Sequence, residues 1–169
     1  MPVTRFIVMR TCRLALAAAG VAAVLAGLPA AAHTQSTGDV AVIVNKDLAV
    51  DNLALADLRR IVLGDREFWP SGARVTLLIH APVARERDAA VKTVCDMTEA
   101  QFRQHWIGKV FRAETATGPK IIYSNESAVE TVSKSPGAIA FVDAGAATKA
   151  VKVLKIDGLL PGQTGYKLK

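Results

Sequence analysis

Short apolar runs separated by helical windows constrain the fold of this chain more than any other sequence feature. Three of these runs are Val40–Val44, Val75–Ile79 and Ala138–Val142, and each lacks interruption by charge. Continuous runs of this kind are typical of strands buried on both faces. Because strands that alternate with helices form crossover units, the pattern predicts an α/β domain. We expect three layers, with a mixed, mostly parallel sheet in the middle.

Residues 51–72 predict a capped helix, a glycine stop and an aromatic turn. Asp51 or Asn52 is expected to cap the helix by accepting hydrogen bonds from its first N–H groups. Apolar residues then recur at helical spacing. Gly64 can end the helix because glycine adopts the left-handed conformation without strain. Trp69 and the phenylalanine before it are expected to close one end of the core.

Further helices are expected at 84–95, 98–111 and 124–133. Thr98-Glu99-Ala100-Gln101 has the form of a capping box. The helix that it opens has an apolar face of Phe102, Trp106, Val110 and Phe111. The rest of the pattern predicts a short strand at 121–123, a short helix at 145–151, and a strand at 151–156 that alternates apolar residues with lysine.

The N-terminal residues predict export from the cytoplasm. Three arginines precede a fifteen-residue apolar run, Leu14–Leu28, and Pro29 and a row of alanines follow it. A basic start, a short apolar middle and a small-residue exit are typical of a secretory signal peptide. The alternative is a membrane anchor, although the run is shorter than the roughly 18 residues that span a bilayer. We therefore expect a leader at 1–32 and a periplasmic domain at 33–169.

Composition and motifs exclude several function classes. Loss of the leader arginines lowers the formal net charge from +6 to about +3. The sequence also lacks a cluster of basic and aromatic residues of the kind that nucleic-acid-binding proteins show. The chain has no nucleophile elbow, phosphate loop or dinucleotide fingerprint, so we do not expect an enzyme. His80, Cys95 and His105 lack zinc spacing, and we expect neither a metal nor a cofactor. Cys95, the one cysteine after the leader, is expected to be a buried thiol rather than a nucleophile.

Anion binding is the chemistry that the residues support best. In an α/β domain, helix N-termini lie at the carboxyl ends of the strands, where their free N–H groups can receive oxyanions. Two such places carry polar residues. The candidate ligand contacts after the strand that ends at Ile79 are His80, Arg85 and Arg87, and those after the strand near Tyr123 are Ser124, Asn125 and Ser127.

Each candidate also has a structural interpretation. Ser124 and Asn125 are common helix caps. Arg85 and Arg87 alternate with two carboxylates, which predicts a solvated face that neutralises itself. His80 can be a hydrogen-bonded residue at the end of a strand. The sequence alone leaves these alternatives open.

Two segments resemble a known family. They are residues 55–78, LADLRRIVLGDREFWPSGARVTLL, and residues 135–143, SPGAIAFVD. Both are similar to segments of the phosphate-type substrate-binding proteins of ABC transporters, and the stretch MTEAQFRQHWIGKVF is similar to short members of that group. The resemblance implies a lobe of a type II periplasmic binding protein. It also implies a non-catalytic protein that holds an oxyanion, typically phosphate, and delivers it to a membrane permease.

The chain departs from the family pattern at the ligand. The family has a Ser-Gly-Thr-type run at the helix start where this chain has Ala84–Asp88, with two carboxylates that would repel phosphate. Residues 33–169 resemble little more than one of the two lobes. Two hypotheses follow from the resemblance. The first is an exported protein that binds a small oxyanion for an ABC transporter. The second is an accessory or protein-interaction domain of the cell envelope that retains the fold without the ligand.

Overall fold

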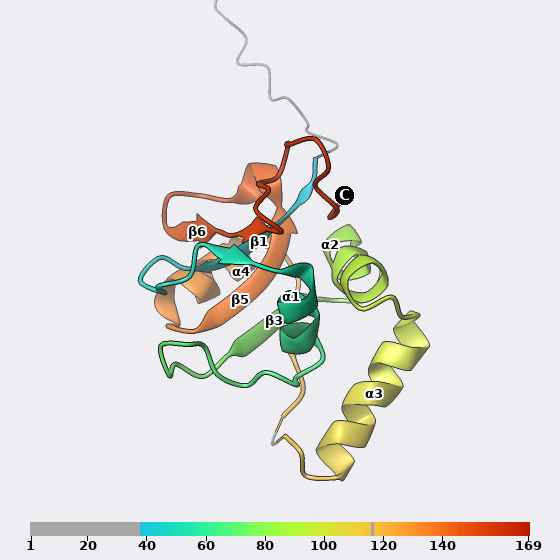
Figure 1. Cartoon of the computed structure of the whole chain (residues 1–169). Helices are drawn as coiled ribbons and strands as arrows, with labels where there is room; N and C mark the ends of the chain where they lie inside the picture. The colour runs from blue at the N-terminus through green and yellow to red at the C-terminus, as the bar shows by residue number, and fades with distance from the viewer. Residues whose placement is uncertain (1–37, 116) are drawn as a thin grey trace, which may run out of the picture. The chain divides into compact units, whose positions relative to one another are not determined.

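The computed structural model describes residues 38–115 and 117–169, whose path is shown in Figure 1. The predicted leader lies outside the described residues. In chain order the elements are β1 (Val40–Asn45), β2 (Asn52–Leu53), α1 (Leu55–Val62), β3 (Thr76–His80), α2 (Arg85–Asp88), the π-helix η1 (Ala89–Val94), α3 (Glu99–Phe111), β4 (Lys120–Ile122), α4 (Asn125–Lys134), β5 (Ala138–Asp143), the 3-10 turn η2 (Ala144–Ala146), β6 (Val151–Val153) and β7 (Lys155–Ile156). Among the described helices, none has the length and apolar character needed to cross a membrane.

The main sheet is mixed, as the sequence predicts. Its strand order is β4-β3-β5-β1-β6. β3 pairs in parallel with both β4 and β5, while β1 pairs antiparallel with β5 and β6. Four strands therefore run in one direction and only β1 runs against them. The carboxyl ends of β3, β4 and β5 consequently meet at the same edge of the sheet.

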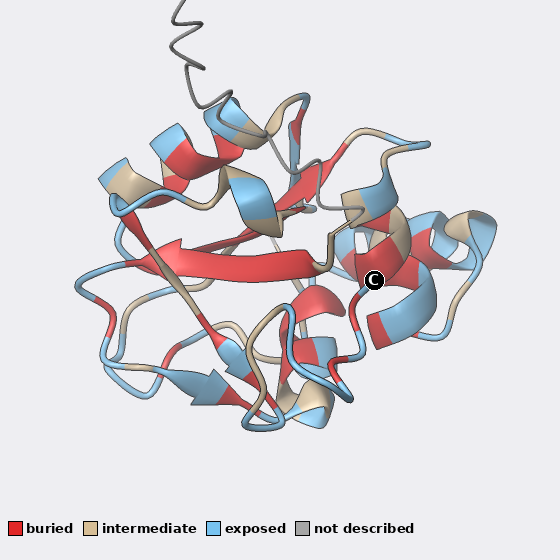
Figure 2. Ribbon diagram, turned by 90° about the horizontal axis from the view of Figure 1, so that it is seen from above, coloured by how far each residue is buried: buried red, intermediate tan, exposed pale blue. Residues whose placement is uncertain are grey.

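Helices cover both faces of this sheet, which confirms the three layers. Alternation along β1 sends Val42 to one face and Ile43 to the other. The first face packs against α1, η1 and the start of α3, and the second against α4. Figure 2 shows the sheet strands as the most continuously buried part of the described chain. Burial on both faces explains why these strands are apolar without alternation.

The cap predicted for α1 is wrong. Ala54 stands at the N-cap and makes no side-chain hydrogen bond to the helix. Instead, the carboxylate of Asp157 accepts from the backbone N–H of Leu55 at 2.9 Å. Asn52 belongs to β2, which pairs in parallel with β7 in a second, two-stranded sheet. Strand pairing therefore draws the expected capping residues away from the helix, and a residue distant in sequence takes their place.

Trp69 joins the two segments that carry the family resemblance. Its side chain is buried, and its indole N–H donates to the carbonyl of Gly137 at 2.9 Å. Gly137 has a φ of 82°, and a Cβ there would lie 2.2 Å from the carbonyl oxygen of Arg74. Glycine is therefore required at this turn. The predicted role of Trp69 as a core plug is confirmed, whereas Phe68 is exposed.

The C-terminal part differs from the expected helix and strand. The predicted helix at 145–151 is a short 3-10 turn, η2, and the predicted strand at 151–156 is divided between β6 and β7. Leu154, which lies between them, is fully buried. The last residues close onto β1, because the Tyr166 hydroxyl donates to the carbonyl of Val40 and the N–H of Val40 donates to the carbonyl of Leu168.

The capping box of α3 is confirmed, but its predicted apolar face is only half covered. Phe102 is buried and Trp106 partly so, whereas Val110 and Phe111 are exposed. In the last turns Lys109 takes the inward position, with its ammonium 2.7 Å from the carboxylate of Asp65. Figure 1 shows the reason, since α3 starts beside α2 and runs away from the sheet. Its final turn therefore leaves Val110 and Phe111 exposed.

Candidate functional site

The structure brings the candidate residues to one edge of the sheet. β3 ends at His80, and α4 begins directly after β4 with Ser124 as its N-cap. Because β3, β4 and β5 are parallel, their carboxyl ends lie side by side. The end of β5 adds Asp143, which sequence reasoning missed. The signal for it was present, since Asp143 follows a buried strand in the same way as His80 does.

Arg85 and Asn125 are linked through Asp143. The guanidinium of Arg85 makes an ion pair with the Asp143 carboxylate. The amide oxygen of Asn125 accepts from the backbone N–H of Asp143 at 3.2 Å, and the amide nitrogen donates to Glu86 at 3.3 Å. These contacts connect the ends of β5 and β4 with α2. Two of the six candidates therefore form one polar cluster, which already contains two carboxylates.

Arg87 is a buried tie between α2, β3 and α3. Its guanidinium donates to both carboxylate oxygens of Glu99, at 2.9 and 2.7 Å, and to the carbonyl of His80 at 2.8 Å. The cation also lies over the ring of Phe102, 5.6 Å from its centroid. The hydrogen bond from Arg87 lowers the pKa of Glu99. All of these groups belong to the protein, so Arg87 is paired without a ligand.

The start of α4 is capped by its own residues. The hydroxyl of Ser124 accepts from the backbone N–H of Ser127 at 3.1 Å, which is the ordinary N-cap contact. The pKa of Glu126 is lowered by a hydrogen bond from its own backbone N–H and then by the Ser124 hydroxyl. A carboxylate therefore stands where an oxyanion would be received. It is exposed, so solvent or a ligand can replace it.

Of the six candidates, only His80 has a buried side-chain polar atom without a partner among the described residues. Its side chain is buried, and its Nε2 has no hydrogen-bond partner among the described residues. A buried imidazole nitrogen without a partner lowers stability relative to a paired one. Among the described residues, the His80 side chain makes no hydrogen bond to Arg85, Asn125 or Asp143, so it stands outside that polar cluster.

Charge at this edge is balanced by carboxylates. Arg85 is paired with Asp143, and Arg87 is paired with Glu99. The Arg85 pair is partly exposed, whereas the Arg87 side chain is buried. An entering oxyanion could therefore bind Arg85 by displacing the Asp143 carboxylate. It could bind Arg87 only by breaking the Arg87–Glu99 ion pair that joins α2 to α3. Arg85 is the residue at this edge that can exchange partners.

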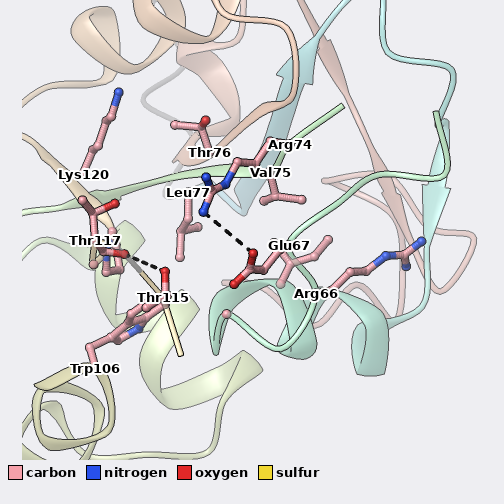
Figure 3. Close-up of a pocket in the computed structure, with 14 residues that line it drawn as sticks. Arg66, Glu67, Arg74, Val75, Thr76, Leu77, Trp106, Thr115, Thr117 and Lys120 are labelled. Carbon is pink, nitrogen blue, oxygen red and sulfur yellow. Dashed lines mark hydrogen bonds and ion pairs between the residues drawn. The ribbon is translucent and has the colours of Figure 1, made fainter. Parts of the chain in front are cut away.

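A separate cavity of about 240 Å³ lies at the opposite ends of β3 and β4, and Figure 3 shows its lining. Arg74 and Glu67 face each other across it at 3.8 Å, and the side chain of Thr115 donates to the carbonyl of Thr117. None of the six candidate residues lines this cavity. Its central charges are paired with each other, so it does not extend the candidate site.

Comparison with solved structures identifies the fold. A protein from Clostridium perfringens, described as a phosphate ABC transporter substrate-binding protein with bound phosphate, matches with a TM-score of 0.59 and 18% identity over 72% of this chain. A phosphate transport receptor from Vibrio cholerae matches with a TM-score of 0.57 and 16% identity over 72% of this chain. PstS from Borrelia burgdorferi matches with a TM-score of 0.56 and 14% identity over 71% of this chain. The described domain has the fold of a lobe of such a binding protein. No family model matches the sequence.

The binding-protein fold confirms the resemblance seen in residues 55–78 and 135–143. The chain spans about half the length of the structures that it matches, 46% and 47% of those chains. This share agrees with the expectation of a lobe. Identities of 14–18% establish the architecture, while the ligand has to be argued from the residues of this chain.

Cys95 is outside the candidate cluster and is buried. Burial raises the pKa of its thiol to about 12. Since the thiolate is the reactive form, we expect a thiol reagent at pH 8 to modify the native protein at least about a thousandfold more slowly than the protein in denaturant. Stopped-flow absorbance with Ellman's reagent measures both rates. Rapid labelling of the native protein would contradict the buried position of Cys95.

Within the described residues, no group of His, Cys, Asp and Glu side chains is arranged to hold a metal ion.

Proposed function

We propose that this chain is an exported, non-catalytic solute-binding-like protein that binds a small oxyanion, such as phosphate, for an ABC transporter. Its leader would be residues 1–32, and its binding domain, residues 33–169, would work in the periplasm. The solved structures that share its fold are described as phosphate transport proteins, one of them with bound phosphate. The observation that carries the proposal is the meeting of Arg85, Asn125 and the start of α4 at one edge of the sheet.

In this proposal Arg85 is the residue that recognises the anion. Its side chain is partly exposed and can turn from Asp143 towards a ligand. A guanidinium makes strong paired hydrogen bonds to an oxyanion, and the N–H groups at the start of α4 add a favourable dipole. Asp143 competes for the same guanidinium. We therefore expect weak binding in the native protein.

The test is calorimetric titration with phosphate, sulfate and acetate. Arg85→Gln is expected to weaken binding at least about tenfold, because it removes the exchanging cation. Asp143→Asn is expected to tighten binding by about tenfold, since it removes the competing charge. Asparagine retains the side-chain oxygen that accepts from Gly145. Arg60→Gln, at an exposed arginine of α1, is the matched control and should change nothing.

A second candidate function is an accessory domain of the cell envelope that retains the fold and has no ligand. The pairing of Arg85 and Arg87 with carboxylates favours it, because both cations are already neutralised. The two candidates give opposite results with Asp143→Asn. If no anion produces heat at millimolar concentration with either the native protein or this variant, the oxyanion proposal is wrong and the accessory role stands.

A further inference from the structure

A second surface shares only Arg87 with the six oxyanion candidates. A groove of about 660 Å³ runs between α3 and β4. We define this α3–β4 groove by the side chains that matter for its chemistry: Phe102, Arg103, Trp106, Ile107, Ile121 and Tyr123. All but one of them are apolar or aromatic. The groove therefore has the character of a binding surface rather than of a solvated face.

The groove continues an exposed apolar patch. Tyr123 is 84% exposed and Ile107 is 55% exposed, and the next turn of α3 adds Phe111 at 90%. Val110 is exposed beside them. Large apolar side chains scattered singly are normal on a protein surface, but a contiguous group marks an interaction site. The uncovered final turn of α3 is thus part of the same surface as the groove.

One wall of the groove is a free sheet edge. Within residues 38–115 and 117–169, β4 is the outermost strand on its side of the sheet and pairs only with β3. The carbonyl of Ile122 accepts from Ala81, so it faces β3. Because successive residues of a strand turn their backbone groups to opposite sides, the N–H and C=O of Ile121 point to the open edge. An extended segment can pair with them there.

The charges of the groove favour an acidic occupant. Arg87 and Glu99 line it as a neutral pair. Arg103 lines the groove, whereas Lys120 lies on the opposite face of β4 from Ile121, on the same face as Leu78 of β3, and both are exposed. In the described part of the chain, neither has a carboxylate within 4.0 Å. The groove lining therefore holds two cations and one carboxylate, and a further cation, Lys120, lies on the other face of the edge strand.

We propose that the α3–β4 groove binds an extended segment of a partner protein in which apolar and acidic residues alternate. The segment adds a strand beside β4 through the backbone of Ile121. Its apolar side chains enter the groove against Phe102 and Ile107, and its carboxylates, which alternation turns to the other face of the sheet, meet Lys120. Arg103 adds positive charge at the groove itself. This proposal goes beyond oxyanion binding and does not depend on it, because none of these contacts involves Arg85 or Asp143.

A synthetic peptide tests the proposal. The probe is a fluorescein-labelled peptide of alternating valine and glutamate, about nine residues long, which covers the groove and its edge. Fluorescence anisotropy should show saturable binding to the native protein. A peptide with lysine in place of glutamate should bind at least about tenfold more weakly. A peptide with N-methylated valines should also bind more weakly, because it lacks N–H donors for the strand edge.

Variants locate the binding. Ile107→Ser and Arg103→Glu are each expected to weaken peptide binding at least about tenfold. Both residues are at the surface of α3, so neither change is expected to unfold the protein, and circular dichroism checks this. Phe68→Ser is the matched control, since Phe68 is equally exposed but lies outside the groove. It should leave peptide affinity unchanged.

Three outcomes would overturn the proposal. Equal binding of the N-methylated peptide would exclude strand pairing, and equal binding of the lysine peptide would exclude the charge match. A dimer in sedimentation that Ile107→Ser dissociates, without peptide binding to the native protein, would assign the surface to a second copy of the chain. Arg85→Gln should not alter peptide binding, so failure of this proposal and failure of the oxyanion proposal remain separate results.

Discussion

Replacing Trp69 with alanine is expected to lower the free energy of unfolding by about 3–5 kcal/mol, as for other large-to-small aromatic changes in a core. The side chain is buried at the end of the core. The change would leave a cavity and would also remove the donor to the carbonyl of Gly137. That carbonyl belongs to the turn before β5, so we expect the loss to loosen the join between the two segments that carry the resemblance. Urea unfolding followed by circular dichroism measures it.

Two further variants separate the effects at this position. Trp69→Phe keeps a six-membered ring but removes the N–H and the five-membered part of the indole, so we expect a smaller loss of about 1–2 kcal/mol. Phe68→Ala, at the exposed neighbour, should change stability by less than about 0.5 kcal/mol. A loss below about 1 kcal/mol for Trp69→Ala would show that Trp69 is not a core residue.

Replacing Arg87 with alanine is expected to lower the free energy of unfolding by about 3 kcal/mol, the lower end of the range for breaking a buried ion pair. The change leaves the carbonyl of His80 without its donor and Glu99 without its cation. The lower end applies because Glu99 is partly exposed and water can take over part of the interaction. Contact of the guanidinium with Phe102 is lost as well.

The matched control is Lys92→Ala, which breaks an exposed pair with Asp88 in the same helical stretch. It should cost about 0.5 kcal/mol or less. If Arg87→Ala is no more destabilising than Lys92→Ala, Arg87 behaves as an exposed surface charge. The claim that its buried guanidinium holds α2, β3 and α3 together would then be wrong. Urea unfolding of both variants at pH 7 decides between these results.

The Arg87–Glu99 pair also predicts a pH dependence. Hydrogen bonding to Arg87 lowers the pKa of Glu99 in the folded protein. A lowered carboxyl pKa contributes stability that is fully present above the unfolded value of about 4.3 and is lost as the pH falls through the folded value. Native stability should therefore fall below about pH 4. In Glu99→Gln, part of this acid dependence should be absent.

Much of the fold could be predicted from local patterns. Apolar runs located β1, β3 and β5, and the capping residues Thr98 and Ser124 marked the starts of α3 and α4. These signals are local, because a strand buried on both faces must be apolar and a helix start needs an acceptor within a few residues. The segments 55–78 and 135–143 also indicated the correct fold.

The failures of prediction have a common physical cause. Asp157 caps α1 from more than a hundred residues away, and Val110 is exposed because α3 runs past the sheet. At the candidate site, Asp143 and Glu99 neutralise Arg85 and Arg87 through contacts between different elements. Such partners are brought together only by folding, so the local sequence pattern does not predict them.

By itself the sequence determined the elements of this protein and the edge of the sheet where its polar residues gather. Hydrophobic periodicity and capping act over a few residues, so they can be recognised without a structure. Only the tertiary structure decided which charges remain available. It paired Arg85 and Arg87 with carboxylates at the predicted site. It left Arg103 at an open apolar groove and Lys120 on the other face of the same edge strand. The availability of a charge depends on its distance from every other element, and that distance exists only in the folded chain.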